Sequence, residues 1–363
     1  MSYATQKLRD ISVIKTGKLD SNAAVENGAY PFFTCDPQTL RINIWAYDTE
    51  AVLLAGNNAS GNYTAKYYRG KFNAYQRTYI IEAADSERLS VRFLCYAINQ
   101  QLRLLKTMSS GSTTKFLTIR MLHNLDIPCP EIEVQDRIVN VLGTIDDLIE
   151  NNQKQIKLLE EAARRLYKEW FVNFRFPGYE NTPIVDGVPE GWADGTLGDI
   201  AVFKRGKTIT KAQVSDGNIP VVAGGLEPAY YHNKANTTAP LITVSASGAN
   251  AGFTRLYNID VFASDCSYID SNSTPFLLFV YCFLKTNAMK LNSLQKGSAQ
   301  PHVYAKDLNA LVLSVPSEGV LTAFCGIVSP YFERIRLLQR ENEIAAQARD
   351  RLLPKLMSGE IEV

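Results

Sequence analysis

The stretch "KLRDISVIKTGK" at Lys7–Lys18 occurs a second time, with small changes, as "TLGDIAVFKRGK" at Thr196–Lys207. Aligning Asp10 with Asp199 sets an offset of 189 residues between the two copies. The same offset matches these further pairs: Lys15 with Lys204, Gly17 with Gly206, Lys18 with Lys207, Gly28 with Gly217, Pro31 with Pro220, and Tyr79 with Tyr268. Matches that continue in order over such a length indicate a tandem duplication, so we expect two similar folded units.

Each copy begins with short segments rich in β-branched and aromatic residues, and Gly/Asn-rich turns separate them. These predicted strands are Ile11–Ile14, Ala51–Leu54 and Thr78–Ile81 in the first copy, and Ile200–Phe203, Leu241–Val244 and Ser267–Ile269 in the second. An apolar run typical of a helix follows, at Val91–Leu105 and at Pro275–Leu291. The pattern predicts a mixed α/β domain for each copy.

A long helix is predicted after each copy, because apolar side chains there step by four and three residues, as in the seam of a coiled coil. The first seam comprises Ile138, Leu142, Ile145, Ile149, Asn152, Ile156, Leu159, Ala163, Leu166 and Trp170. The second, 186 residues later, comprises Phe324, Val328, Tyr331, Ile335, Leu338, Asn342, Ala345, Arg349, Leu352 and Leu356. The alternative is two ordinary amphipathic helices, each lying on its own domain.

Together these features predict a mixed α/β (α+β) fold with an internal pseudo-two-fold repeat. Two similar domains are expected, separated by two long antiparallel coiled-coil helices. The expected boundaries are residues 1–130 for the first domain, 131–178 for the central helix, 179–316 for the second domain and 317–363 for the C-terminal helix.

Composition excludes few classes of protein. Lys and Arg number 38 against 37 Asp and Glu, so total charge points neither to nucleic acid nor to a membrane surface. Apolar runs such as Phe276–Leu284 are too short to span a bilayer, and we expect a cytoplasmic protein. The six cysteines stand alone, without C-x-x-C spacing, which is typical of small core residues.

Catalytic residues of a duplicated enzyme should recur in both copies, and the histidines do not. His123 aligns with Asn309, His302 with Phe116, and His232 with Asn43. Asp10 and Asp199 do recur, but an acid in this position more often caps a turn. Acidic and histidine residues are not clustered with the spacing of metal ligands. We therefore expect no catalytic residues, no metal and no cofactor on this chain.

Positive charge is segregated along the chain. Residues 51–81, 88–125, 200–215 and 271–306 contain no Asp or Glu but many Lys and Arg, which could pair with phosphates. The expected backbone contacts are Lys15, Lys18, Lys66, Arg69, Lys71, Lys115, Lys204, Arg205, Lys207 and Lys296, with Tyr63 interleaved. An ordinary solvated surface is the other interpretation of such stretches.

Loops within these stretches are suited to reading DNA bases. "AGNNASGNY" (Ala55–Tyr63) and "SASGANAG" (Ser245–Gly252) combine small residues with polar side chains that can bond to base edges. "SSGSTTK" (Ser109–Lys115) and "KGSAQPH" (Lys296–His302) do likewise. The expected base contacts are Asn57, Asn58, Ser112, Thr113, Thr114, Ser247, Asn250, Ser298, Gln300 and His302. The loops differ between the copies, as expected for readers of two different half-sites.

The whole pattern resembles the specificity subunit of type I restriction-modification systems. The resemblance rests on "PEGW…TLGDIAVFKRGK", which opens a half, "GSTTKFLTIRMLHNLDIPCP", which closes one, and the helices "ENNQKQIKLLEEAARRLYKEWFVNFRFPG" and "RENEIAAQARDRLLPKLMSGEI". It implies two target recognition domains, each reading one half of a bipartite, asymmetric site in double-stranded DNA.

The resemblance also implies partner subunits. Two modification (methyltransferase) subunits would bind S-adenosylmethionine and methylate adenine, and restriction (endonuclease/translocase) subunits would use ATP and Mg²⁺ and cleave DNA. The chain lacks the methyltransferase motif "N/D-P-P-Y/F/W", which agrees with a non-catalytic role. Two alternatives remain at this point: a duplicated hydrolase or nuclease, and a coiled-coil adaptor that binds no DNA.

Overall fold

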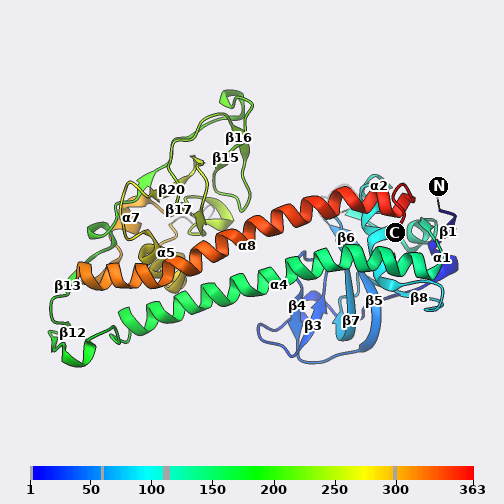
Figure 1. Ribbon diagram of the computed structural model, residues 1–363, viewed down its shortest axis with the longest axis horizontal. Coiled ribbons are helices and arrows are strands. Elements are labelled where there is room, and N and C mark those ends of the chain that lie inside the picture. Colours follow the sequence, from blue (N-terminus) through cyan, green and yellow to red (C-terminus); the bar gives the residue numbers. More distant parts are fainter. Residues whose placement is uncertain (1–2, 59–60, 109–114, 297–300) are drawn as a thin grey trace. The chain divides into compact units, whose positions relative to one another are not determined.

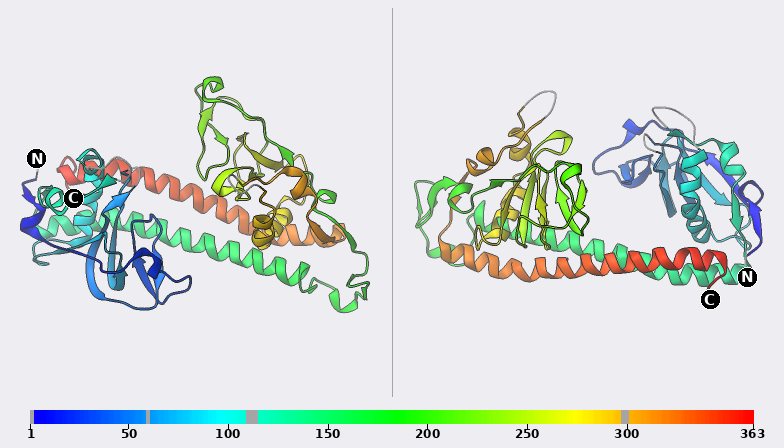
Figure 2. Two further views of the ribbon diagram at one scale, coloured as in Figure 1. Left: turned by 180° about the vertical axis from the view of Figure 1, so that it is seen from behind. Right: turned by 90° about the horizontal axis from the view of Figure 1, so that it is seen from above.

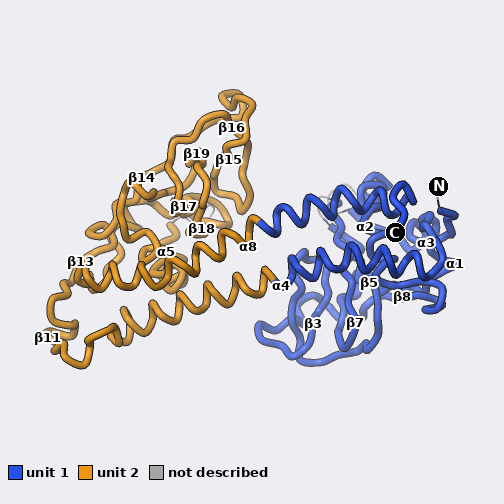
Figure 3. Tube along the Cα trace, viewed as in Figure 1, with its two compact units in different colours: residues 1–151, 341–363 blue, residues 152–340 orange. Residues whose placement is uncertain are grey.

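The computed structural model describes residues 3–58, 61–108, 115–296 and 301–363. The chain divides into two compact units (Figure 3). Unit 1 comprises Met1–Asn151 and Glu341–Val363, and unit 2 comprises Asn152–Arg340. Each unit contains one domain built on a β-sheet together with one segment from each of two long helices.

Unit 1 is built on a six-stranded sheet with the order β2-β8-β5-β7-β3-β4. The strands are β2 (Ser12–Thr16), β3 (Tyr30–Phe33), β4 (Leu40–Ile42), β5 (Tyr47–Ala55), β7 (Ala65–Ala74) and β8 (Thr78–Ala83). All neighbouring strands are antiparallel except β3 and β7, which pair in parallel.

Both faces of the central strand β5 are buried, as the alternation of side chains along a strand requires. Val52 and Leu54 pack in the cluster that includes Phe93, from helix α2 (Val91–Met108). Ala51 and Leu53 belong to a second cluster, with Phe33, Phe72 and Ile80. The sheet therefore has a helix-covered face and an aromatic face.

Unit 1 also contains shorter elements outside this sheet. They are β1 (Thr5–Lys7), α1 (Leu8–Ile11), η1 (Ser21–Ala23), β6 (Asn57–Asn58), β9 (Lys115–Phe116), α3 (Ile119–His123) and β10 (Asp126–Pro128). β1 pairs with β10, and β6 pairs with β9, both antiparallel. These pairings join segments that are far apart in the sequence.

Unit 2 repeats this arrangement in two sheets, β14-β20-β17-β18 and β16-β15-β19. The strands are β14 (Lys204–Arg205), β15 (Ile219–Val222), β16 (Tyr230–His232), β17 (Leu241–Ser245), β18 (Thr254–Tyr257), β19 (Phe262–Ala263) and β20 (Cys266–Asp270). β15 and β19 pair in parallel, as β3 and β7 do in unit 1. Helix α5 (Leu277–Thr286) lies between these strands and the long helices (Figures 1 and 2).

Unit 2 also contains short elements before, between and after these strands. They are η2 (Tyr179–Asn181), β11 (Ile184–Val185), β12 (Val188–Pro189), β13 (Ala193–Thr196), η3 (Leu197–Asp199), η4 (Lys211–Gln213), η5 (Gly248–Asn250), α6 (Ala288–Ser293), α7 (Ala305–Asn309) and β21 (Val312–Val315). β13 pairs with β21, so the beginning of the second copy is bonded to its end.

The repeated glycine in the opening phrase marks a close approach of two backbone segments. A Cβ added to Gly17 would lie 2.1 Å from the carbonyl oxygen of Ala74, and one added to Gly206 would lie 2.2 Å from that of Ser264. No side chain fits at that separation. Glycine is thus required at both positions for space, which explains why both copies of the phrase carry it.

Strand pairing corrects two details of the sequence alignment. Lys15 lies opposite Ile80 and Lys204 lies opposite Tyr268, so Tyr268 corresponds to Ile80 and not to Tyr79. His232 lies opposite Ile219 in the pair β15·β16, and Ile42 lies opposite Tyr30 in β3·β4. His232 therefore corresponds to Ile42 and not to Asn43, because the loop before it is one residue longer. The first copy still has no histidine at this place.

The two long helices are α4 (Ile132–Phe171) and α8 (Glu318–Ser358). Every predicted seam position on both helices is buried or half-buried, Asn152 and Asn342 included, which confirms the heptad pattern. In unit 1, Ile138 and Leu142 of α4 belong to one cluster with Leu356 of α8. Farther along α4, the carboxylate of Asp146 pairs with Arg349 at 2.9 Å. The partner number falls as the α4 number rises, so the helices pack antiparallel in this unit.

In unit 2 the same helices meet through aromatic side chains. Trp170 of α4 lies 5.8 Å from Phe324 of α8, measured between ring centroids. Tyr167 contacts both Phe324 and Phe279 of helix α5, at 6.2 and 5.5 Å. The seam thus joins the two helices, while the flank of α4 packs on the domain. The helix-on-helix interpretation is confirmed, and within the described ranges no helix is long and apolar enough to cross a membrane.

Candidate nucleic-acid interface

In unit 1, two segments that the sequence singled out separately lie side by side at one end of the sheet. Strand β6 pairs with β9, which places Asn57 opposite Phe116 and Asn58 opposite Lys115. The N–H of Gly56 donates to the carbonyl oxygen of Arg77 at 2.8 Å, and the Gly56 carbonyl accepts from the N–H of Leu117 at 2.8 Å. We call the segments 56–58, 76–77 and 115–117 the unit 1 frame.

Unit 2 builds the same frame from segments 246–248, 264–265 and 301–303. The N–H of Ala246 donates to the carbonyl oxygen of Asp265 at 3.2 Å, and the Ala246 carbonyl accepts from the N–H of Val303 at 3.0 Å. Ser247 forms a β-bridge with His302, as Asn57 does with Phe116. By these bonds Asp265 takes the place of Arg77, and His302 takes the place of Phe116.

A cavity of about 320 Å³ opens at the unit 1 frame. Its lining residues are Thr16, Gly56, Gln76, Arg77, Tyr79, Phe116 and Leu117. The Arg77 guanidinium lies over the Phe116 ring, 5.3 Å from its centroid. The hydroxyl of Tyr79 donates to the carbonyl of Leu117 at 2.9 Å. Burial raises the pKa of this hydroxyl, so Tyr79 lines the cavity as an uncharged side chain. An exposed cation on an aromatic face is thereby presented to solvent.

The unit 2 frame presents different chemistry. The hydroxyl of Ser247 donates a short hydrogen bond to the carboxylate of Asp265. The imidazole of His302 stacks on the ring of Tyr304, with centroids 5.9 Å apart and planes 10° apart. The ammonium group of Lys306 lies 5.9 Å from the same tyrosine ring. The carboxylate of Asp265, a hydrogen-bond acceptor, thus takes the place of the cation of unit 1.

Several expected DNA contacts in unit 1 have partners within the protein. Lys15 pairs with Glu82 at 2.6 Å. The ammonium group of Lys66 donates to the carbonyl of Asp36 and the hydroxyl of Thr39, both at 3.2 Å, and its partial burial lowers its pKa. Lys71 lies over the ring of Trp45 at 4.7 Å. These cations can meet a phosphate only by sharing or exchanging these contacts.

Tyr63 does not fit its expected role at the surface. Its side chain is 5% exposed and packs in the main hydrophobic cluster of unit 1. The polar and basic neighbours of Tyr63 suggested an exposed loop, but the chain turns inward at this residue, and the ring contributes to the core instead.

The remaining expected contacts divide by position. Exposed in the structure are Lys18, Arg69, Lys204, Arg205, Lys207 and Lys296, the last paired with Asp307 at 2.8 Å. Half-buried are Asn57, Asn58, Lys115, Ser247, Asn250 and His302. Outside the described residues lie Ser112, Thr113, Thr114, Ser298 and Gln300. Their contacts with DNA stay predictions.

Sequence reasoning left Gln76, Phe116 and Asp265 out of the site, and it counted Arg77 only among the basic residues. The signal for Arg77 was its place in the acid-free stretch 51–81. Asp265 gave no signal at all, because an acid in a basic domain argues against phosphate contact. Only the hydrogen bonds of the frame show that the two residues are equivalent.

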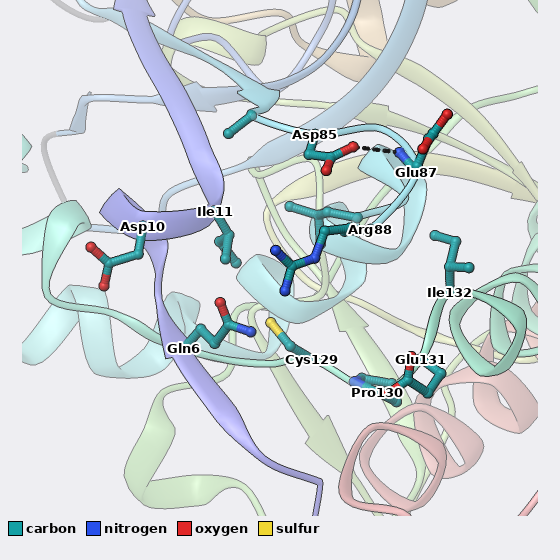
Figure 4. A pocket seen from close by; sticks show the side chains of 12 residues that line it. Gln6, Asp10, Ile11, Asp85, Glu87, Arg88, Cys129, Pro130, Glu131 and Ile132 are labelled. Carbon is teal, nitrogen blue, oxygen red and sulfur yellow. Dashed lines mark hydrogen bonds between the residues drawn. The ribbon is translucent and has the colours of Figure 1, made fainter.

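Another cavity of unit 1, of about 200 Å³, is lined by residues of β1, α1 and the segments 84–89 and 129–132 (Figure 4). Its lining includes Arg88, the acidic residues Asp10, Asp85, Glu87 and Glu131, and Cys129. Partial burial raises the pKa of the Cys129 thiol, which keeps it protonated and a poor nucleophile. Among the described residues, no group of three or more His, Cys, Asp and Glu is placed to hold a metal ion.

The recurring acids and the cysteines have structural positions. The Asp199 carboxylate accepts from the N–H of Thr196 at 2.7 Å and from its hydroxyl at 3.0 Å, so the expected cap is confirmed in the second copy. Asp10 pairs with Arg9 at 3.4 Å and forms no cap. All six cysteines carry free thiols and are buried or half-buried, as expected of core residues.

Comparison with known proteins agrees with this architecture. The family model described as "Type I restriction modification DNA specificity domain" matches the chain over residues 2–161 and 189–344. The Type I restriction enzyme EcoDI specificity subunit of Escherichia coli is 33% identical over 178 residues, which cover 49% of this chain and 38% of that protein. The MjaIX specificity subunit of Methanocaldococcus jannaschii is 30% identical over 286 residues, which cover 71% and 66%. The matches thus span less than two thirds of both relatives.

One crystal structure has the same fold along nearly the whole chain. The type I restriction-modification S subunit from M. genitalium aligns with a TM-score of 0.62 and 18% sequence identity. The alignment covers 98% of this chain and 96% of that one. The aligned region therefore includes both domains and both long helices.

Proposed function

Because the chain belongs to the type I restriction modification DNA specificity family, we propose that it selects the DNA sequence on which a type I restriction-modification complex acts. Each domain reads one half of a bipartite, asymmetric site in double-stranded DNA. The chain itself performs no catalysis and directs adenine methylation or cleavage by partner subunits.

The observation that carries this proposal is the frame built twice with different side chains. Equivalent backbone bonds position Arg77 and Phe116 in one unit, and Asp265 and His302 in the other. A repeated enzyme would keep the same reacting groups in both copies. A repeated reader of two different half-sites keeps the scaffold and changes the groups that meet the bases.

The exposed cations supply the sequence-independent part of binding. Lys18 and Lys207 follow the repeated glycine in their copies, and Lys204 and Arg205 lie on strand β14. All four are exposed. Pairing with phosphates releases condensed counterions, so such residues contribute affinity for any DNA sequence and make binding weaken as salt rises.

Two copies of one modification subunit fit the internal repeat. Exposed apolar side chains recur at equivalent positions of the two long helices: Val141 with Ile327, and Leu158 with Ile344. Equivalent surfaces suit two copies of a single partner. The modification subunits would bind S-adenosylmethionine, and restriction subunits would bind ATP and Mg²⁺. None of these cofactors is assigned to this chain, and the complex would work in the cytoplasm, where it meets DNA.

The test is to sequence methylated adenines in cells that express this chain with its cognate modification subunit. We expect one bipartite motif. Replacing Thr196–Pro316 by the matching segment of another specificity subunit should change one half of the motif and preserve the other. Loss of both halves together would show that the two domains do not read independently, and absence of any motif would contradict the proposal.

Two further measurements separate the alternatives. Incubating the purified chain with plasmid and Mg²⁺ tests for a nuclease, and cleavage by the chain alone would contradict a non-catalytic role. Titrating DNA binding at several salt concentrations tests for an adaptor that binds only protein. Phosphate contacts give a falling log–log slope, whereas such an adaptor gives no DNA binding to measure.

A further inference from the structure

We infer that Arg77 and Asp265 are specificity-determining residues, each fixing one base pair in its own half-site. Arg77 donates to guanine, and Asp265 accepts from the amino group of cytosine. The inference rests on the function proposed above and deepens it, because it names the groups that distinguish the two halves.

The first argument is position. In each unit, the main-chain carbonyl of this residue accepts a hydrogen bond from the first residue after the central strand. Gly56, which follows β5, donates to Arg77 at 2.8 Å, and Ala246, which follows β17, donates to Asp265 at 3.2 Å. Both residues adjoin the short pairing that joins the two expected reading loops of their unit. Because main-chain hydrogen bonds fix the positions of Arg77 and Asp265, their side chains are available to contact DNA.

The chemistry of Arg77 suits guanine. Its guanidinium is exposed and rests on the Phe116 ring, which limits its rotation without using its N–H donors. A planar fork of donors matches the O6 and N7 acceptors that guanine presents in the major groove. The cavity of about 320 Å³ next to it leaves room for a base edge to approach.

The chemistry of Asp265 is opposite in sign. One hydrogen bond, from the hydroxyl of Ser247, orients its carboxylate. A carboxylate has more acceptor positions than this one donor occupies, and cytosine N4 is the amino group that Asp and Glu usually contact in the major groove. A phosphate would be repelled by this carboxylate, so a base edge is the DNA group that it fits.

The test measures binding of the full chain, in complex with its cognate modification subunit, to duplexes that carry the wild-type motif or one altered base pair. For Arg77→Ala we expect preference at a single G·C pair to fall by about 5- to 150-fold, the range of one bidentate contact. Asp265→Ala should relax a single C·G pair in the other half. Arg103→Ala, which removes an exposed charge from helix α2, is the matched control and should relax no position.

A second variant separates loss of base recognition from misfolding. Arg77→Lys keeps the charge but loses the fork, so it should relax the same pair while leaving the salt dependence unchanged. Equal weakening on every duplex in Arg77→Ala, with a salt slope lower by about one, would overturn the inference, because that is the signature of a phosphate contact. Unchanged preference in either alanine variant would overturn it as well.

These outcomes differ from failure of the proposed function. If the wild-type complex prefers no sequence, the proposed function fails, and the inference fails with it. If the wild-type complex is specific and Arg77→Ala remains equally specific, only the inference fails. A melting temperature within a few degrees of wild type shows that each variant is folded.

Discussion

Substituting the repeated glycines should damage the two halves of the protein separately. The nearest backbone oxygens to an added Cβ are 2.1 Å away at Gly17 and 2.2 Å away at Gly206, whereas real Cβ contacts stay above 3.0 Å. Gly17→Ala or Gly206→Ala must therefore push two backbone segments apart by nearly 1 Å. Neither glycine has a positive φ, so crowding alone causes the effect.

The expected cost follows from what this shift disrupts. Overpacking costs about 1–3 kcal/mol. The N–H of Gly206 donates to the carbonyl oxygen of Cys266 at 2.8 Å, and weakening this bond adds about 1 kcal/mol. The total of roughly 2–4 kcal/mol is a large part of the 5–15 kcal/mol that stabilises a typical domain. Gly326→Ala, in helix α8 with open space around its Cβ, should instead stabilise by up to about 1 kcal/mol.

The assay combines denaturant unfolding with half-site recognition. Both glycine variants should unfold at lower denaturant concentration than wild type, and Gly326→Ala at equal or higher concentration. Gly17→Ala should weaken discrimination in one half of the methylated motif only, and Gly206→Ala in the other half only. Wild-type stability in Gly17→Ala or Gly206→Ala would refute the steric argument, and damage to both halves by either one would refute their independence.

Three further predictions concern charge and helix length. Hydrogen bonds from Thr196 lower the pKa of Asp199, so its stabilising effect is complete above its unfolded pKa of about 3.9 and is lost as the pH falls through the lower folded value. Asp199→Asn should therefore flatten the acid side of a plot of melting temperature against pH, and an unchanged plot would contradict the cap. Lys207→Ala should lower the salt slope of DNA binding by about one. Lys15→Ala should lower it by less, because Glu82 already pairs with Lys15 at 2.6 Å. An equal decrease in both variants would show that the Lys15–Glu82 ion pair opens when DNA binds. Inserting four residues after Asn152 adds about 6 Å and roughly one turn to α4. The number of unrecognised base pairs between the two half-sites of the methylated motif should therefore grow by one or two. Inserting two residues instead turns the seam by about 200° and should abolish function. Methylome sequencing tests this prediction. An unchanged spacer after the four-residue insertion would show that the length of α4 does not set the distance between the half-sites.

Much of the fold was predictable because its signals are local. A heptad seam depends only on the spacing of side chains along one helix, and every predicted position from Ile138 to Trp170 and from Phe324 to Leu356 is buried or half-buried. The duplication was visible for a similar reason, since Gly17 and Gly206 must be glycine wherever this close approach is built. The domain boundaries expected at 130, 178 and 316 stay predictions.

The candidate site was predictable only in part. Composition located the loops near Asn57 and Lys115, but the bond from Leu117 to Gly56 that brings them together joins distant parts of the chain. Composition also treated all cations alike, although Lys66 is half-buried and bonded to Asp36, while Lys18 is exposed. Solvent exposure and partners depend on how the whole sheet closes.

The sequence by itself determined that this protein is a duplicated pair of mixed α/β domains with two long helices, because repeats and periodicities can be recognised along a single chain. Only the tertiary structure decided that Arg77 and Asp265 occupy the same place, and that Tyr63 belongs to the core. The physical reason is that hydrogen-bond partners and burial are set by contacts between segments far apart in sequence, and side-chain types along one segment carry no record of those contacts.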